Sequence, residues 1–167
     1  VWLRAGDLIF AIAGRPVNSR VNPSQLLQGT VGKEVLLVVA PKDSPEVKRT
    51  IKIKPISRGG YAQLRYTNWL KKNVALVRSG GKGEIAYIHL TAMNAANLAM
   101  FERYLAGSAR KKKALIIDVR NNGGGNIHQQ LLDILGRRPF AYVVPRGGKK
   151  TYQPGLTWNK PVCVLIN

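Results

Sequence analysis

The stretch ALIIDVRNNGGGNIHQQLLDIL, residues 114–135, decides the fold of the second half of this 167-residue chain. Its first six residues are apolar except for Asp118, which is typical of a β-strand covered on both faces. Apolar residues then recur at helical spacing, with Ile127, Leu131 and Ile134 on one face, and we expect Asn126 to cap that helix. The stretch therefore predicts a strand, a glycine-rich loop and a helix, the repeating unit of α/β proteins.

The three consecutive glycines, 123–125, have three possible uses on spacing alone: a tight turn, an oxyanion hole for acyl transfer, or a phosphate site. A helix N-terminus carries free N–H groups and about half a positive charge, and preceding glycines can turn further amides toward an anion. The phosphate-loop pattern G-x-x-x-x-G-K-[ST] is absent, and RGGKKT at 146–151 lacks a strand–loop–helix frame.

The rest of the second half alternates helix and strand. A helical face through residues 66–77 is followed by the strand EIAYIHL (84–90), a helix ending at Gly107, and the strands FAYVV (140–144) and PVCVLIN (161–167). This order implies right-handed crossovers and a mainly parallel sheet. His89 is expected to be structural and His128 to face solvent, and we expect no metal site and no cofactor.

The first half has a different rhythm, with short strands around one short helix. NPSQLLQG (22–29) predicts a helix capped by Asn22 with Pro23 at its first position, and EVLLVVA (34–40) and VKRTIKIKP (47–55) predict strands. PISRGG contains a proline and two glycines and is typical of a linker. We therefore expect a domain over 1–54, a linker over 55–60 and a second domain over 61–167.

Composition excludes several classes of protein. With 45% hydrophobic residues the chain can bury a core and is not of the disordered class, and no apolar run reaches the ~18 residues of a membrane helix. The net charge of +19 is scattered over helix ends and turns, which predicts a basic surface without a dedicated role, with nucleic-acid binding as an alternative. The single Cys163, in an apolar run, is expected to be buried.

Two runs in the first half, LRAGDLIFAIAGRPV (3–17) and SQLLQGTVGKEVLLVV (24–39), together resemble a PDZ domain of the bacterial protease type. The matching positions are Leu3, Gly6, Asp7, Ile9, Ile12, Gly14, Val17, Leu26, Leu27, Gly32 and Lys33. The resemblance implies a small β-barrel, incomplete at its N-terminal side, that binds peptides by strand addition. Asn22, Gln25 and Leu26, on the helix that borders the groove, are the peptide-binding residues it implies.

The pattern D-x-R-x-N-x-G-G after an apolar strand resembles the C-terminal processing, or tail-specific, serine peptidases. The positions that match are Asp118, Arg120, Asn122, Gly124 and Gly125, and Gly123 stands where many members have proline. The run NGGG, with GEIAYIHL (83–90) and KPVCVLIN (160–167), is closer to the tricorn-like branch. This resemblance implies that the second half is a crotonase-like, mainly parallel α/β core. It also implies that this core, like the PDZ half, is truncated. The expected fold class is therefore α/β, or α+β for the chain overall.

The resemblance implies a serine-type peptidase acting on peptides or unfolded proteins. Its serine would follow the strand matched by VCVLIN and its histidine base would precede the PDZ domain, so both are expected outside this chain, which alone should be inactive. The amides of Gly124 and Gly125 are the implied oxyanion donors. We expect a homo-oligomer for the full-length protein, no specific nucleic acid, no membrane segment and a cytoplasmic location, with export as the alternative. A non-catalytic peptide-binding scaffold and a basic nucleic-acid binder are the competing functions.

Overall fold

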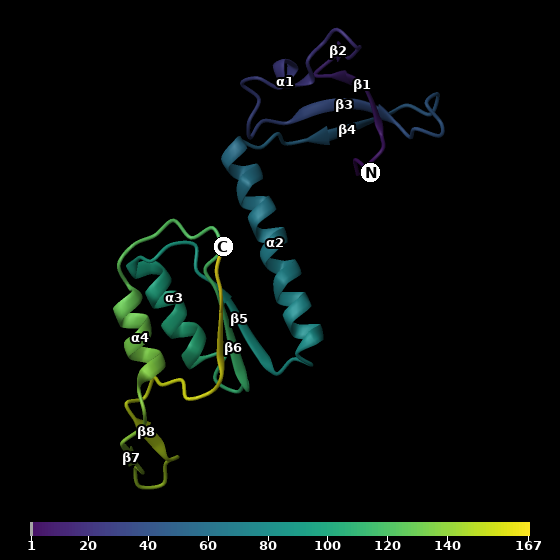
Figure 1. Ribbon diagram of the computed structural model, residues 1–167. Helices are drawn as coiled ribbons and strands as arrows, with labels where there is room; N and C mark the ends of the chain where they lie inside the picture. Colours follow the sequence, from purple (N-terminus) through teal and green to yellow (C-terminus); the bar gives the residue numbers. More distant parts are fainter. Residues whose placement is uncertain (1) are drawn as a thin grey trace. The chain divides into compact units, whose positions relative to one another are not determined.

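A computed structural model describes residues 2–167, and the chain divides into two compact units, the first ending at Thr67 and the second beginning at Asn68 (Figure 1). The division falls within helix α2 (Arg58–Gly80). Residues 58–60 of the expected linker form the first turn of α2, because the Ser57 hydroxyl accepts a hydrogen bond from the Gly60 amide at 3.0 Å and caps the helix. Val1, at the start of the expected PDZ domain, lies outside the described residues.

The first unit contains an antiparallel sheet in the order β2-β1-β3-β4. Its strands are β1 (Leu8–Ile12), β2 (Arg15–Pro16), β3 (Val35–Ala40) and β4 (Arg49–Ile53). Alternate residues of β3 point to one face and are buried with neighbours from the adjoining strands. Within residues 2–67 this sheet stays open, with β2 and β4 at its edges, so the small barrel expected from the sequence is not closed there.

The short helix α1 (Pro23–Leu26) lies between β2 and β3 in the chain and was predicted from its capping signals. The Asn22 side chain accepts a hydrogen bond from the Ser24 amide at 3.0 Å, and Pro23 follows at the first helical position. Leu26 and Leu27 are partly buried against the core of the first unit. Helix capping and packing therefore account for the positions of Asn22, Leu26 and Leu27 in this short segment.

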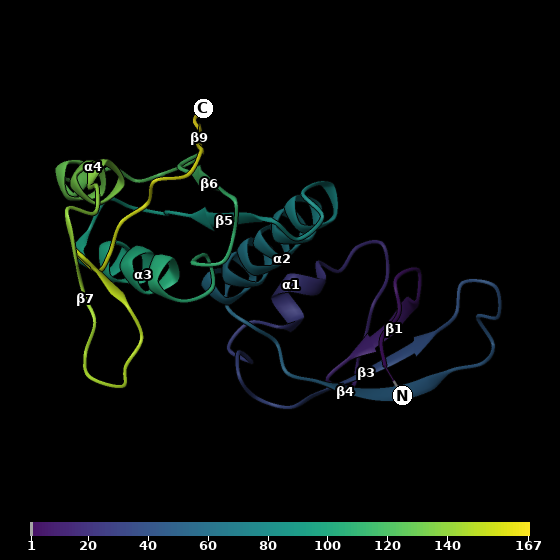
Figure 2. The same cartoon turned by 90° about the horizontal axis from the view of Figure 1, so that it is seen from below.

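The second unit is built on a parallel sheet in the order β5-β6-β9, which confirms the predicted α/β core. The strands β5 (Ile85–His89), β6 (Ala114–Asp118) and β9 (Val162–Leu165) are joined by crossovers containing α3 (Ala95–Ala106) and α4 (His128–Gly136). Both helices pack on one face of the sheet, where Phe101, Leu105, Leu131 and Ile134 join one buried apolar cluster (Figures 1 and 2). None of the helices within residues 2–167 combines the length and apolar character needed to cross a membrane.

Period-two alternation sends the remaining side chains of β5 and β6 to the other face of the sheet. Ala86 and Ile88 join the helix-covered core, whereas Tyr87, His89 and Asp118 face the opposite side. There Asn73, from the second half of α2, donates to the Tyr87 hydroxyl at 3.3 Å. The parallel register sets His89 opposite Asp118, at the carboxyl ends of both strands. Polar side chains therefore gather at the sheet edge where ligands bind in open α/β folds.

Three details of the second unit differ from the sequence-based expectations. An exposed antiparallel hairpin, β7 (Ala141–Val143) with β8 (Thr151–Gln153), stands where only one strand was expected. Cys163 is exposed rather than buried, because β9 pairs only with β6 among the described residues. Asn126 does not cap α4: the cap position is Ile127, without a side-chain hydrogen bond, and the Asn126 amide donates to the Met93 carbonyl instead.

Candidate active site

The glycine loop, residues 118–126, leaves the carboxyl end of β6 and leads into α4. Two of its glycines adopt positive φ angles, +84° at Gly124 and +132° at Gly125. A Cβ atom on Gly125 would lie 2.1 Å from the Met93 carbonyl oxygen, so no other residue fits there, whereas a Cβ on Gly124 would meet nothing within 4 Å. Glycine is therefore required at position 125 because the backbone of Met93 lies too close to leave room for a side chain.

Almost every amide of the glycine loop already has an acceptor. Four of these amides donate to backbone carbonyls: Val119 to Leu165, Asn122 to Val119, Gly123 to Thr91, and Asn126 to Met93. The other three donate to side-chain oxygens: Arg120 to Asp118 Oδ1, Asn121 to Asn167 Oδ1, and Gly124 to Asn122 Oδ1. The bridge between Met93 and Gly125 is made by the amides of Met93 and Asn126. Within residues 2–167, Gly125 is thus the loop residue whose amide is left without an intramolecular acceptor.

The start of α4 adds further positive potential next to Gly125. The first N–H groups of a helix have no partner within the helix, and α4 has neither a side-chain cap nor an acidic residue in its first turn. His128, the first helical residue, is exposed, as predicted. A small anionic group placed against Gly125 would therefore meet one free amide and the positive end of a helix dipole.

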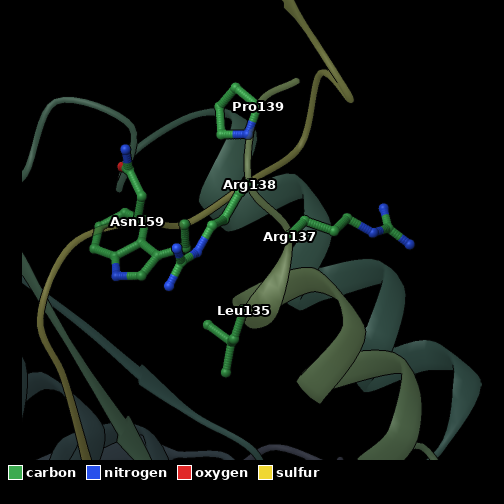
Figure 3. A pocket seen from close by; sticks show the side chains of 7 residues that line it. Leu135, Arg137, Arg138, Pro139 and Asn159 are labelled. Carbon is green, nitrogen blue, oxygen red and sulfur yellow. The ribbon is translucent and has the colours of Figure 1, made fainter. Parts of the chain in front are cut away.

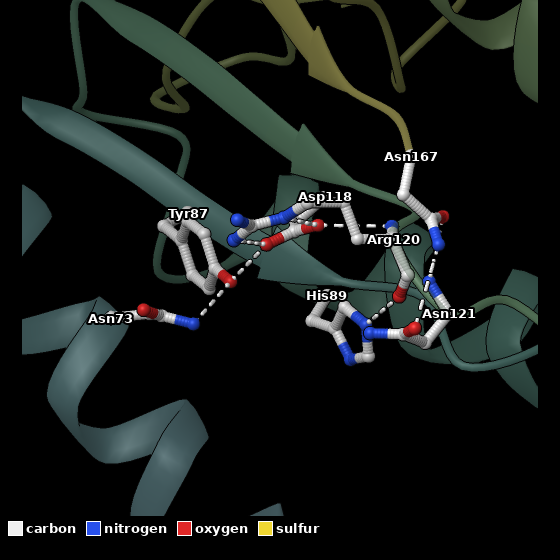
Figure 4. A network of polar contacts seen from close by, with 7 residues as sticks. All are labelled: Asn73, Tyr87, His89, Asp118, Arg120, Asn121 and Asn167. Atoms are coloured by element: carbon white, nitrogen blue, oxygen red, sulfur yellow. Dashed lines mark hydrogen bonds and ion pairs between the residues drawn. The ribbon is translucent and has the colours of Figure 1, made fainter.

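An ion pair between the buried Asp118 carboxylate and the partly exposed Arg120 side chain anchors the beginning of the glycine loop (Figure 4). The carboxylate of Asp118 is fully buried and accepts from Arg120 Nε at 3.0 Å, Arg120 Nη2 at 2.6 Å and the Tyr87 hydroxyl at 2.6 Å. Burial alone would raise the pKa of Asp118, but the hydrogen bonds from Arg120 and Tyr87 and the charge of Arg120 outweigh it and hold the pKa below its usual value. Burial, followed by the bond to Asp118, raises the pKa of Tyr87 to about 12.

His89 holds the next peptide group of the loop. Its Nε2 lies 2.9 Å from the Arg120 carbonyl oxygen, and because a carbonyl only accepts, Nε2 carries the proton in this bond. The imidazole packs edge-on against Trp69, with ring centroids 4.8 Å apart. The structural role predicted for His89 stays a prediction, and the ring contacts the loop at the Arg120 carbonyl.

Asn122 ties the middle of the glycine loop to Leu90, the residue that follows β5. Its Nδ2 donates to the Leu90 carbonyl at 2.7 Å, and its Oδ1 accepts from the Gly124 amide at 2.7 Å. The amide of Gly124, which the sequence suggested as an oxyanion donor, is therefore occupied by a neighbouring side chain. The sequence motif singled out Asn122 without assigning it this contact.

Comparison with known proteins supplies the family. A model of peptidase family S41 matches residues 84–167, half of the chain, which includes β5, β6, the glycine loop and β9. The chain belongs to peptidase family S41. A model of the tricorn protease PDZ domain matches residues 1–58. The resemblance to the tricorn-like, C-terminal processing serine peptidases is thereby confirmed.

Individual proteins similar to this S41 chain also carry tricorn protease names. It is 34% identical over 167 residues to tricorn protease homolog 1 of Streptomyces coelicolor and 29% identical over 162 residues to the tricorn protease of Thermoplasma volcanium. A crystal structure of the tricorn protease matches 97% of the chain with a TM-score of 0.67 and 27% identity. In all three comparisons the chain covers 15% of the other protein's length.

No candidate nucleophile lies in the glycine loop of this S41 chain. The chain has six serines, at positions 19, 24, 44, 57, 79 and 108. In the second unit, Ser79 donates to the Leu76 carbonyl, and Ser108 follows α3, whose 12 residues place it ~18 Å from the end of that helix near Met93. Residues 118–126 therefore offer electrostatic stabilisation of an oxyanion without a hydroxyl to attack the substrate.

The three residues expected to border a PDZ groove have separate roles in the first unit. Asn22 caps α1, Leu26 packs against the core, and Gln25 is exposed. Of these three, Gln25 is the side chain most available to a peptide.

A shallow pocket lies at the carboxyl end of α4, ~13 Å along this nine-residue helix from the glycine loop (Figure 3). It is lined by Leu135, Gly136, Arg137, Arg138, Pro139, Trp158 and Asn159. Arg137 and Arg138 also follow the negative end of the helix dipole, where basic side chains are ordinarily favourable. This pocket is separate from the amides that the site presents.

Proposed function

We propose that the protein containing this chain is a serine-type peptidase, and that the glycine loop binds the oxyanion of its tetrahedral intermediate. Membership of family S41 supports the reaction. The observation that carries the role of the loop is the free amide of Gly125 in a segment whose other amides have acceptors. A donor held in place before the reaction stabilises developing charge without reorganisation.

The two glycines expected to donate differ in readiness. The Gly125 amide is free to donate to an oxyanion at once. The Gly124 amide must first break its hydrogen bond to Asn122 Oδ1, 2.7 Å away. We therefore propose Gly125 as the first donor and Gly124 as a second donor that acts only when Asn122 releases it. Loss of one such donor typically lowers turnover ~10²–10³-fold.

The test uses the full-length protein and a fluorogenic peptide. Replacing the serine that the family resemblance places after β9 with alanine should lower kcat ~10⁴-fold or more and abolish labelling by a fluorophosphonate probe. The 167-residue chain, assayed as a matched control, should show no turnover, because its glycine loop has no nucleophile. Peptide cleavage by this purified chain, or a full-length protein that neither cleaves nor takes up the probe, would contradict the proposal.

We also propose that the first unit binds the end of a peptide chain. The match to the tricorn protease PDZ domain supports this, as do the open edge strands β2 and β4, since PDZ domains add a peptide strand to a sheet edge. Replacing the exposed Gln25 with alanine should weaken binding of a labelled peptide with a free carboxylate severalfold in fluorescence anisotropy. Lys42→Ala, in the β3–β4 turn, is the control, and equal effects of both changes would argue against a groove beside α1.

A further inference from the structure

The Tyr87 hydroxyl links β5 to the carboxylate of the ion pair that starts the glycine loop, by donating to Asp118 Oδ2 at 2.6 Å. Tyr87 is 7% exposed, and its hydroxyl contacts two internal groups, Asp118 Oδ2 at 2.6 Å and Asn73 Nδ2 at 3.3 Å. A side chain enclosed in this way cannot touch a substrate with its hydroxyl. Any effect on the reaction must therefore pass through the groups that the hydroxyl contacts, and of Asp118 and Asn73 it is Asp118 that lies in the glycine loop.

We infer that Tyr87 is a positioning residue for the peptidase reaction: its hydroxyl fixes the Asp118 carboxylate, and through it the glycine loop that presents the Gly125 amide. This inference rests on the proposed function. The Tyr87 contact with Asp118 joins two strands whose pairing in register places Tyr87 opposite Ile116 and His89 opposite Asp118. It is thus a diagonal link across the sheet, directed at the residue from which the loop departs.

The carboxylate passes this constraint to the backbone of the loop. Asp118 Oδ1 accepts from the Arg120 amide at 3.0 Å, and Oδ2, which accepts from Tyr87, also accepts from Arg120 Nη2 at 2.6 Å. The rotation of the carboxylate therefore determines where the Arg120 amide can lie. Without the Tyr87 hydroxyl, Oδ2 would lose one of its two donors in a fully buried position, and the carboxylate could turn.

The rest of the loop is connected in sequence to that point. His89 holds the Arg120 carbonyl at 2.9 Å, and the Asn122 side chain holds both Leu90 and Gly124. A shift at Arg120 is therefore transmitted along a short, fully bonded segment to Gly125. Displacement of a reacting group's partner by about 1 Å can lower a rate by as much as ~10²-fold.

Tyr104 offers a matched control for a merely structural effect. Its hydroxyl accepts from the Tyr87 amide at 3.0 Å, so Tyr104→Phe also removes a partly buried tyrosine hydroxyl and a hydrogen bond on the same strand. It leaves the bond between Tyr87 and Asp118 in place. Both variants should be less stable, but only Tyr87→Phe should alter the geometry of the glycine loop.

The experiment compares Tyr87→Phe and Tyr104→Phe in the full-length protein. We measure kcat and KM for a fluorogenic peptide and the affinity for a peptide boronic acid, whose tetrahedral adduct places an oxygen in the oxyanion hole. Tyr87→Phe should lower kcat about tenfold and boronate affinity by a similar factor, with KM within about twofold. Tyr104→Phe should change kcat and boronate affinity by less than about twofold.

Asn73→Ala provides a milder variant that removes the other partner of the same hydroxyl, and it should lower kcat by a smaller factor than Tyr87→Phe. If the wild-type protein is active and Tyr87→Phe leaves kcat and boronate affinity unchanged, the role of Tyr87 is overturned. Equal losses in Tyr87→Phe and Tyr104→Phe would overturn it as well. A wild-type protein without turnover or probe labelling would instead overturn the proposed function on which the inference rests.

Discussion

The glycine loop at 118–126 and the loop at 144–150 of the hairpin both combine glycines with basic side chains, yet their surroundings differ. In the glycine loop, amides and side chains bond to β9, to Asn167 and to the segment between β5 and α3. In the hairpin loop the backbone bond is local, from the Gly148 amide to the Pro145 carbonyl, and the flanking strands are exposed (Figure 1). Glycine content alone therefore does not define a site.

What distinguishes the two loops is how many long-range acceptors hold the backbone. In the hairpin loop, water can take any free donor, so no amide is directed at a particular point. In the glycine loop the neighbours of Gly125 are fixed on both sides, and the free amide has a defined direction. The predictions that follow compare the two loops, from the largest expected effect to the smallest.

Replacing Gly125 with alanine should have the largest effect. The added Cβ would lie 2.1 Å from the Met93 carbonyl oxygen in a residue with φ +132°, so the bridge to Met93 must break. We expect a loss of ~3 kcal/mol or more in urea unfolding of the 167-residue chain. Gly147→Ala in the hairpin, with φ +72° and no atom within 4 Å of the added Cβ, should cost ~1 kcal/mol. Similar losses would remove the distinction between the loops.

Replacing Asp118 with asparagine should destabilise the chain by ~2 kcal/mol at neutral pH, because Arg120 and Tyr87 lose a charged acceptor. The folded protein lowers the pKa of Asp118, so its contribution is fully present above pH ~4 and is lost as the pH falls below that value. The difference between the wild type and Asp118→Asn should therefore shrink in unfolding experiments below pH ~4. A difference that stays constant from neutral pH to pH ~2 would contradict the ion pair.

Asn122→Ala should cost ~1.5 kcal/mol, since it removes the bonds to the Leu90 carbonyl and from the Gly124 amide. Amide hydrogen exchange should accelerate at Gly124, which loses its acceptor. Asn97→Ala, on the exposed first turn of α3, loses an amide contact to Asn94 and should cost less than ~0.5 kcal/mol. Unchanged exchange at Gly124 would show that Asn122 does not occupy this amide.

Lys150→Ala should have the smallest effect. The ammonium group lies 3.8 Å from the centroid of the Tyr142 ring and 5.1 Å from that of Tyr152, on an exposed hairpin. An exposed cation–π contact contributes ~0.5 kcal/mol, so the melting temperature should fall by ~1–2 °C. A fall as large as that of Asn122→Ala would mean that the hairpin is more tightly held than its contacts indicate.

Local patterns in the sequence were sufficient to predict the parallel core. The apolar run at 114–119 and the helical spacing after it indicated β6 and α4, and the alternation of elements indicated the crossovers. The free amide could not be predicted this way. It depends on acceptors such as Thr91, Met93 and Asn167, which lie about 30 or more residues from the loop in the sequence and meet it only in the folded sheet.

The wrong predictions have related causes. Asn126 has a good residue type for a cap, but α4 begins at His128, so the cap position falls on Ile127 instead. The apolar run around Cys163 indicated a strand without indicating how many layers cover it. The predicted pair of donors, Gly124 and Gly125, stays a prediction, and the bond from Gly124 to Asn122 sets the order proposed for them.

The Asn122–Gly123 pair has a chemical consequence for the ageing of the protein. In flexible chains an asparagine before glycine deamidates readily, because the next backbone nitrogen attacks the side-chain amide and closes a succinimide ring. Here the Gly123 nitrogen is bonded to the Thr91 carbonyl and both polar atoms of the Asn122 side chain are held, so the attack requires the loop to open. The rate at which aspartate and isoaspartate accumulate at position 122 during storage is therefore a slow chemical clock for the opening of this loop.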